Sequence, residues 1–139
     1  MRDNVKINLP GYAKYKGKGF HAFILHRISG LGTILFLTLH IATTATVFYA
    51  PQWYDTLVEI FRNPIVMIAE IILAFFVIYH GVNGLRIAYV DLIHPDLWKK
   101  VPTSKLMSAV FAVTFLLWLP AAGILGYNLL KHGFNLFGS

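Results

Sequence analysis

Residues 64–90, PIVMIAEIILAFFVIYHGVNGLRIAYV, are almost entirely apolar and begin with a proline, which suits the first turn of a helix. A helix needs about 20 residues to cross the hydrocarbon core of a bilayer, so this stretch predicts a transmembrane helix. Near its end it carries His80, Gly81, Gly84 and Arg86. Polar side chains at membrane depth cost free energy unless they are paired. This end of the span is therefore a candidate functional site.

Two further apolar blocks are long enough to cross a bilayer, at about 21–50 and about 104–130. The chain of 139 residues is 57% hydrophobic and 13% charged, with a mean hydropathy of +0.62. Soluble domains carry roughly 25% charged residues, so much of the usual charge is missing. The sequence therefore predicts an all-α membrane protein with three transmembrane helices, which form a single anchor domain over residues 1–139.

The segments outside the spans are short and polar. Residues 52–63 are expected to form a short amphipathic connector, with Asp55 and Glu59 one turn apart. Residues 1–20 are basic, and Pro10 with the glycines around it argues against a regular helix there. We expect this tail to be solvated. The alternative is that it packs against a partner protein or anionic lipid headgroups.

The distribution of basic residues predicts the orientation, because cytoplasmic loops are enriched in Lys and Arg. Ten of the twelve fall on the side of the N-terminus and the second loop: Arg2, Lys6, Lys14, Lys16, Lys18, Arg27, Arg86, Lys99, Lys100 and Lys105. Arg62 and Lys131 fall on the opposite side. The N-terminus is therefore predicted to be cytoplasmic. Because these charges flank apolar spans, they indicate topology and not nucleic-acid binding.

Composition also excludes several kinds of site. The chain has no cysteine, which rules out disulfides, thiolate metal sites and iron–sulfur clusters held by this chain. It has no nucleotide-binding motif. The first twenty residues lack the apolar core of a signal peptide, so we expect the first span to direct membrane insertion.

The polar residues of the first span share one helical face. At 100° per residue they fall within about 60° of one another: His26, Ser29, Thr33, His40 and Thr44. Small hydroxyl residues are common where membrane helices pack. Packing therefore accounts for the serine and the threonines, but not for His40 in the apolar middle of the span.

His80 and His40 are the candidate metal-ligating residues. No carboxylate lies near either histidine in its span. An imidazole at membrane depth needs a partner, and the iron of a haem is a suitable one. Gly84, one turn from His80, and the adjacent Gly81 would let a flat ring approach the backbone. The alternative is that both histidines only pack or relay protons.

Two motifs resemble a known family. Residues 26–30, HRISG, are similar to the HR-x-S-G signature of the cytochrome b membrane-anchor subunit of succinate dehydrogenase, respiratory complex II. Residues 80–91, HGVNGLRIAYVD, resemble that subunit's second signature, H-x-x-x-G-x-R-H-x-x-x-D. Two positions depart from the pattern. Phe23 stands where the family often has a serine that serves the quinone, and Ile87 stands where the second signature has its final histidine.

The resemblance implies a cofactor and its contacts. His80 would be an axial ligand of haem b, and a second small membrane-anchor subunit would supply the opposite ligand and complete a helical bundle of which this chain is half. His26 and Arg86 would neighbour the haem propionates. Arg27 and Ser29 would belong to a quinone region near the inner membrane face, close to the last Fe–S cluster of the iron–sulfur subunit.

His40 is additional to the pattern of a single haem. At the rise of an α-helix, His80 lies roughly 15 Å and His40 roughly 27 Å from the inner ends of their helices. Two axial ligands of one iron lie at nearly the same depth. We therefore expect His40 to ligate a second haem b, which some members of the family carry.

The function implied by the resemblance is a haem b-binding anchor of succinate dehydrogenase. The chain would be an electron-transfer subunit without a succinate-oxidising site, passing electrons from a flavoprotein subunit and an iron–sulfur subunit to quinone. The alternatives are the anchor of a quinol:fumarate reductase and a haem-free structural or transport subunit. Because the N-terminus does not resemble a transit peptide, we expect the cell membrane of a prokaryote and not the mitochondrial inner membrane.

Overall fold

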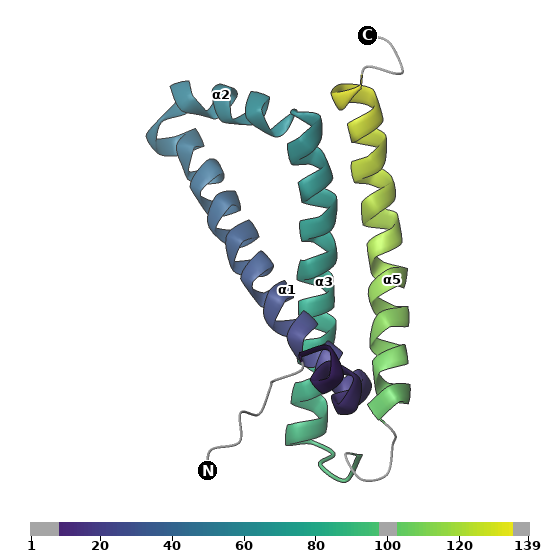
Figure 1. Cartoon of the computed structure of the whole chain (residues 1–139). Coiled ribbons are helices and arrows are strands. Elements are labelled where there is room, and N and C mark those ends of the chain that lie inside the picture. The colour runs from purple at the N-terminus through teal and green to yellow at the C-terminus, as the bar shows by residue number, and fades with distance from the viewer. Residues whose placement is uncertain (1–8, 98–102, 135–139) are drawn as a thin grey trace, which may run out of the picture.

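The computed structural model describes residues 9–97 and 103–134, with side chains over 20–97 and 105–134 (Figure 1). These residues form four α-helices and a short π-helical turn: α1 (Leu9–Tyr49), α2 (Pro51–Phe61), α3 (Pro64–Leu92), α5 (Thr103–Asn128) and η1 (Leu129–Gly133). No strand occurs in the described ranges. The prediction of an all-α fold is confirmed.

Three of the helices contain stretches that are long and apolar enough to cross a membrane: Phe20–Tyr49, Pro64–Leu92 and Lys105–Gly133. Many large apolar side chains on them face outward, among them Leu31, which is 72% exposed, and Phe48, which is 80% exposed. Apolar surface on this scale requires lipid or another subunit to cover it. The prediction of three transmembrane helices is confirmed.

α1 begins earlier than the sequence predicts. We expected residues 1–20 not to form a regular helix, but α1 starts at Leu9 and continues through the glycines that follow. Pro10 falls in the first turn, where its missing N–H breaks no intrahelical hydrogen bond. A glycine inside a helix costs only about 1 kcal/mol relative to alanine. The prediction was therefore wrong for this part of the segment, and residues 1–8 lie outside the described residues.

Four of the basic residues on which the orientation depends lie outside the described residues: Arg2, Lys6, Lys99 and Lys100. The start of α1 and the end of α5 lie at opposite ends of the molecule (Figure 1), as an odd number of spans requires. A cytoplasmic N-terminus stays a prediction.

α2 connects α1 to α3 across the end where these two helices stand apart (Figure 1). It begins at Pro51, and α3 begins at Pro64, so each helix has a proline at a position that needs no N–H. The side chain of Asn63 caps α3 by accepting a hydrogen bond from the N–H of Ile65 at 2.9 Å. None of the residues of α2 is buried, and Trp53 is 60% exposed. The predicted connector is thus a surface helix.

The helices converge at one end of the molecule. α3 and α5 run side by side in opposite directions, whereas α1 crosses α3 near the lower end in Figure 1 and leans away from it toward α2. A buried apolar cluster joins the three spans: Ala22, Tyr79, Met107 and Val110. The Tyr79 hydroxyl, which is fully buried, donates a hydrogen bond to the carbonyl oxygen of Ala22 at 3.3 Å. This cluster holds α1 against α3 beside the two sequence motifs.

Candidate functional site

Two histidines face each other across the contact between α1 and α3. The rings of His26 in α1 and His80 in α3 are stacked, with centroids 4.2 Å apart and planes within 5° of parallel. Both side chains are partly buried. The contact brings together the two motifs, although the histidines are separated by 54 residues in the chain.

The Nδ1 atom of His80 faces the backbone of α1. It lies 3.1 Å from the carbonyl oxygen of His26 and 3.5 Å from the hydroxyl oxygen of Ser29. The Ser29 hydroxyl donates to the same carbonyl at 2.9 Å. A carbonyl only accepts hydrogen bonds, so Nδ1 of His80 is the donor in this contact, and in the neutral imidazole the lone pair is then at Nε2. Metal-ligating histidines commonly donate their other ring N–H to a backbone carbonyl in this way. His80 is therefore prepared to bind a metal through Nε2.

The glycines near the histidines have different surroundings. A Cβ added to Gly30 would lie 2.9 Å from Cε1 of His80, which is closer than real Cβ atoms come. A Cβ on Gly84 would lie 3.8 Å from Cε1 of His26, which is an ordinary contact, and a Cβ on Gly81 would meet nothing within 4 Å. Of these three glycines, only Gly30 cannot gain a Cβ without displacing the His80 ring.

His26 and Arg86 provide a polar environment that suits an anionic group. Nδ1 of His26 is buried and has no hydrogen-bond partner among the described residues. The charge of Arg86 acts electrostatically on both His26 and Tyr79. A buried nitrogen without a partner is costly, and a carboxylate held between this nitrogen and the guanidinium would satisfy it. The residues present therefore fit a haem, whose propionates are carboxylates.

The site offers one metal ligand and not a cluster. The described residues contain no group of three or more His, Cys, Asp or Glu side chains that could hold a metal ion. His26 cannot complete an iron site with His80, because two axial imidazoles point their nitrogens at each other across the iron, whereas these rings lie face to face. Among the described residues, His80 could therefore supply one ligand to a metal, and a further ligand would have to come from elsewhere.

The structure separates the two residues of the predicted quinone region. Arg27 is exposed on α1, with its guanidinium 4.5 Å from the centroid of the Phe23 ring. Ser29 is fully buried and faces His80. Ser29 therefore forms part of the surroundings of His80, and only Arg27 remains open to a ligand outside the chain.

His40 lies far from His80. It is fourteen residues beyond His26 on α1, which is about 21 Å at the rise of an α-helix, and α1 has leaned away from α3 by that point (Figure 1). Its ring is exposed and stacks on Phe36, with centroids 5.7 Å apart and an interplanar angle of 10°. The fold does not bring the two candidate metal ligands together.

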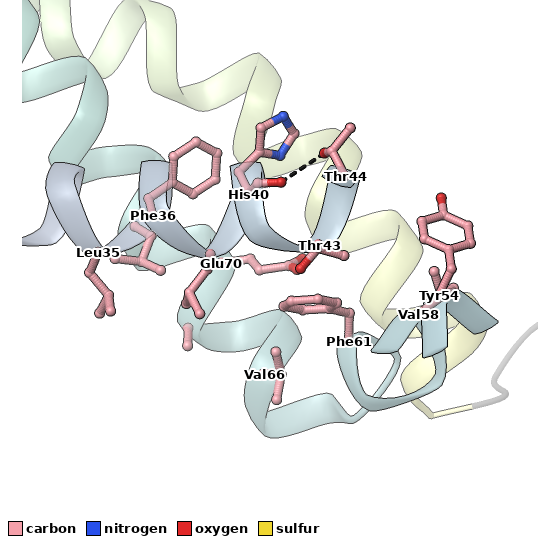
Figure 2. Close-up of a pocket in the computed structure, with 13 residues that line it drawn as sticks. Leu35, Phe36, His40, Thr43, Thr44, Tyr54, Val58, Phe61, Val66 and Glu70 are labelled. Carbon is pink, nitrogen blue, oxygen red and sulfur yellow. Dashed lines mark hydrogen bonds between the residues drawn. The ribbon is translucent and has the colours of Figure 1, made fainter. Parts of the chain in front are cut away.

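His40 instead lines a cleft of about 470 Å³ between α1, α2 and α3 (Figure 2). Its walls are mainly apolar, and Glu70 and Tyr54 add a carboxylate and a phenol. Figure 2 shows the His40 ring on the side of α1 opposite Leu35, pointing away from Phe61 and Val66. Sequence reasoning missed this cleft because three separate helices build it. The available signal was Glu70, a carboxylate inside an apolar span.

Comparison with known proteins identifies the family of the chain. Residues 6–121 match the family described as the succinate dehydrogenase/fumarate reductase transmembrane subunit. The chain belongs to this family. It is also 30% identical over 126 residues to the succinate dehydrogenase 2 membrane subunit SdhC of Mycobacterium tuberculosis (strain ATCC 25618 / H37Rv), over 88% of this chain and 89% of the relative.

The family resemblance predicted from the two motifs is confirmed. As a member of the succinate dehydrogenase/fumarate reductase transmembrane subunit family with three apolar spans, the chain is a multi-pass membrane protein. Membership fits a non-catalytic subunit of an enzyme complex and implies that other subunits accompany it.

Proposed function

We propose that the chain is the haem b-binding membrane anchor of a succinate dehydrogenase and passes electrons from an iron–sulfur subunit to quinone. The observation that carries the proposal is the contact between Nδ1 of His80 and the carbonyl oxygen of His26 at 3.1 Å, which leaves Nε2 of His80 available for iron. The family includes fumarate reductases, but the similarity to a mycobacterial succinate dehydrogenase subunit supports succinate dehydrogenase.

The residues of this chain have distinct tasks at the haem. His80 would ligate the haem iron, and His26 and Arg86 would hold the propionates. A haem b ligated by two histidines would supply a one-electron carrier without an open coordination position, which suits electron transfer and not oxygen chemistry. Ligation needs a neutral imidazole, and the hydrogen bond from Nδ1 to the His26 carbonyl favours the neutral tautomer that has its lone pair at Nε2.

Other subunits must supply what this chain does not have. A second small membrane-anchor subunit provides the opposite axial ligand and covers part of the exposed apolar surface. The iron–sulfur clusters belong to an iron–sulfur subunit, because this chain has no cysteine, and succinate oxidation belongs to a flavoprotein subunit. The bacterial relative supports the cell membrane of a prokaryote as the location.

Arg27 is the proposed quinone-binding residue of this chain. Its guanidinium lies on the exposed face of α1, directly after His26. A cationic donor holds a quinone carbonyl by a charge-assisted hydrogen bond and stabilises the negative charge that develops during reduction. The stacking of Arg27 on Phe23 keeps the guanidinium at this end of the helix.

A second haem b at His40 is a separate part of the proposal. It is supported by the exposure of the His40 ring and by the length of α1 between His26 and His40, which prevents one iron from serving both His40 and His80. The partner subunit would again provide the opposite ligand.

The test is a reduced-minus-oxidised absorption spectrum of the complex purified from membranes with its partner subunits. We expect a haem b band in the wild type. His80→Leu should remove the haem assigned to that residue while the complex remains assembled, and His132→Leu, at an exposed position in η1, should retain it. An assembled wild-type complex without a haem b band would refute the proposal.

A further inference from the structure

We infer that one turn of α1, His26–Gly30, forms a slot that fixes the plane of the His80 ring, with Gly30 and the His26 ring as positioning residues for this ligand. The inference rests on the proposed ligation of haem by His80. It extends that proposal to α1, the helix that does not carry His80. In this inference α1 sets the orientation of the His80 ring and the strength with which Nε2 donates to the iron.

The slot contacts the His80 ring on three sides. The His26 ring covers one face at a centroid distance of 4.2 Å. The His26 carbonyl holds the Nδ1 edge at 3.1 Å. The backbone of Gly30 lies against the Cε1 edge, where a Cβ would come within 2.9 Å. Residues 26 and 30 lie one turn apart on the same face of α1, so a single helical turn presents all three contacts.

These contacts have consequences for an axial ligand. The second torsion of a histidine side chain is soft, and a ring without contacts samples a broad range of orientations. Stacking on one face and contact at two edges remove this freedom. The hydrogen bond at Nδ1 also raises the basicity of Nε2, which favours the oxidised form of the iron. The slot therefore determines both the plane of the ligand and how strongly it donates.

Gly30→Ala tests the slot directly. The new methyl group would collide with Cε1 of His80, so the ring has to turn and the hydrogen bond to the His26 carbonyl is weakened. In the purified complex we expect altered electron paramagnetic resonance g-values of the oxidised haem and an upward shift of its midpoint potential. Gly123→Ala on α5 is the matched control, because it makes the same change inside another membrane span, where a Cβ meets nothing within 4 Å. It should behave like the wild type.

A second pair of variants tests the stacked ring. His26→Phe keeps a flat ring and the backbone carbonyl but loses the nitrogen proposed to hold a propionate, so its g-values should lie closer to those of the wild type than the g-values of His26→Ala. His26→Ala keeps the carbonyl but removes the ring, so the g-values should change. If Gly30→Ala prevents assembly, this pair of variants tests the slot instead. The ratio of haem to flavin in the purified complex monitors assembly.

The outcomes separate the slot from the proposed function. Loss of haem in Gly30→Ala from a complex that still contains flavin supports the slot, provided that Gly123→Ala retains haem. Equal g-values and midpoint potentials in Gly30→Ala and Gly123→Ala would overturn it, as would equal spectra of His26→Ala and His26→Phe. If haem is present in the wild type and depends on His80, these results reject the slot alone. A wild-type complex without haem rejects the proposed function as well.

Discussion

Gly32 of α1 lies directly against the ring of Phe76 in α3: a Cβ at position 32 would be only 2.6 Å from Cδ2 of that ring. Real Cβ atoms essentially never approach so closely. Gly30, on the same helix, has a similar relationship with His80. Small residues let membrane helices approach closely, so the contact between α1 and α3 depends on glycines that carry no functional group.

Gly32→Ala should therefore destabilise the complex. The added methyl group must displace Phe76 or separate the helices, and overpacking of this kind typically costs about 1–3 kcal/mol. We expect a lower midpoint of thermal unfolding for the purified complex. Gly123→Ala on α5 is the control, because it raises helix propensity in the same way at a position where a Cβ meets nothing within 4 Å. Equal midpoints for the two variants would contradict this prediction.

Trp118→Phe should weaken the contact between α5 and α3. The indole N–H of Trp118 donates a hydrogen bond to the carbonyl oxygen of Ile71 at 3.1 Å, and a phenylalanine cannot replace this donor. We expect a loss of about 1 kcal/mol in the thermal stability of the complex. The control is Trp53→Phe on α2, where the side chain is 60% exposed. A larger loss of thermal stability in Trp53→Phe than in Trp118→Phe would show that the hydrogen bond to Ile71 contributes little.

Arg27→Gln should impair the reduction of quinone and spare the oxidation of succinate. Loss of a charge-assisted hydrogen bond costs about 1.5–3 kcal/mol, so quinone reduction should fall by about 10- to 100-fold. Succinate oxidation measured with an artificial dye that accepts electrons before quinone should be unchanged. Arg62→Gln, a change of the same type in the connection between α2 and α3, should leave both activities intact. A parallel decrease of both activities in Arg27→Gln would indicate a defect of assembly instead.

His40→Leu should reduce the haem content of the complex from two haems per flavin to one. The side chain lines the cleft between α1, α2 and α3, and leucine has a similar volume but no metal-binding nitrogen. The ratio of haem to flavin measured in pyridine extracts is the readout, and His132→Leu is the control. A wild-type complex with one haem that His40→Leu retains would remove the second haem from the proposal.

Much of the fold follows from local properties of the sequence. Apolar length predicts the three spans, and Pro64 predicts where α3 begins. The start of α1 was predicted wrongly, since proline and glycine are weak evidence against a helix when the proline falls in the first turn. The motif around His26 and the motif around His80 were sufficient to predict the family.

Contacts between helices were not predictable in the same way. Three features depend on the position at which α1 crosses α3. His26 stacks on His80, Ser29 faces inward while Arg27 faces outward, and His40 shares a cleft with Glu70.

The sequence alone therefore determined the class of protein, the number of spans and the histidines that deserve testing, because hydropathy and helical period are properties of each segment by itself. The tertiary structure decided which of those residues meet. The physical reason is the packing of Gly30 and Gly32 against side chains about 50 residues away. This packing places the crossing at His80 and leaves His40 beside an open cleft.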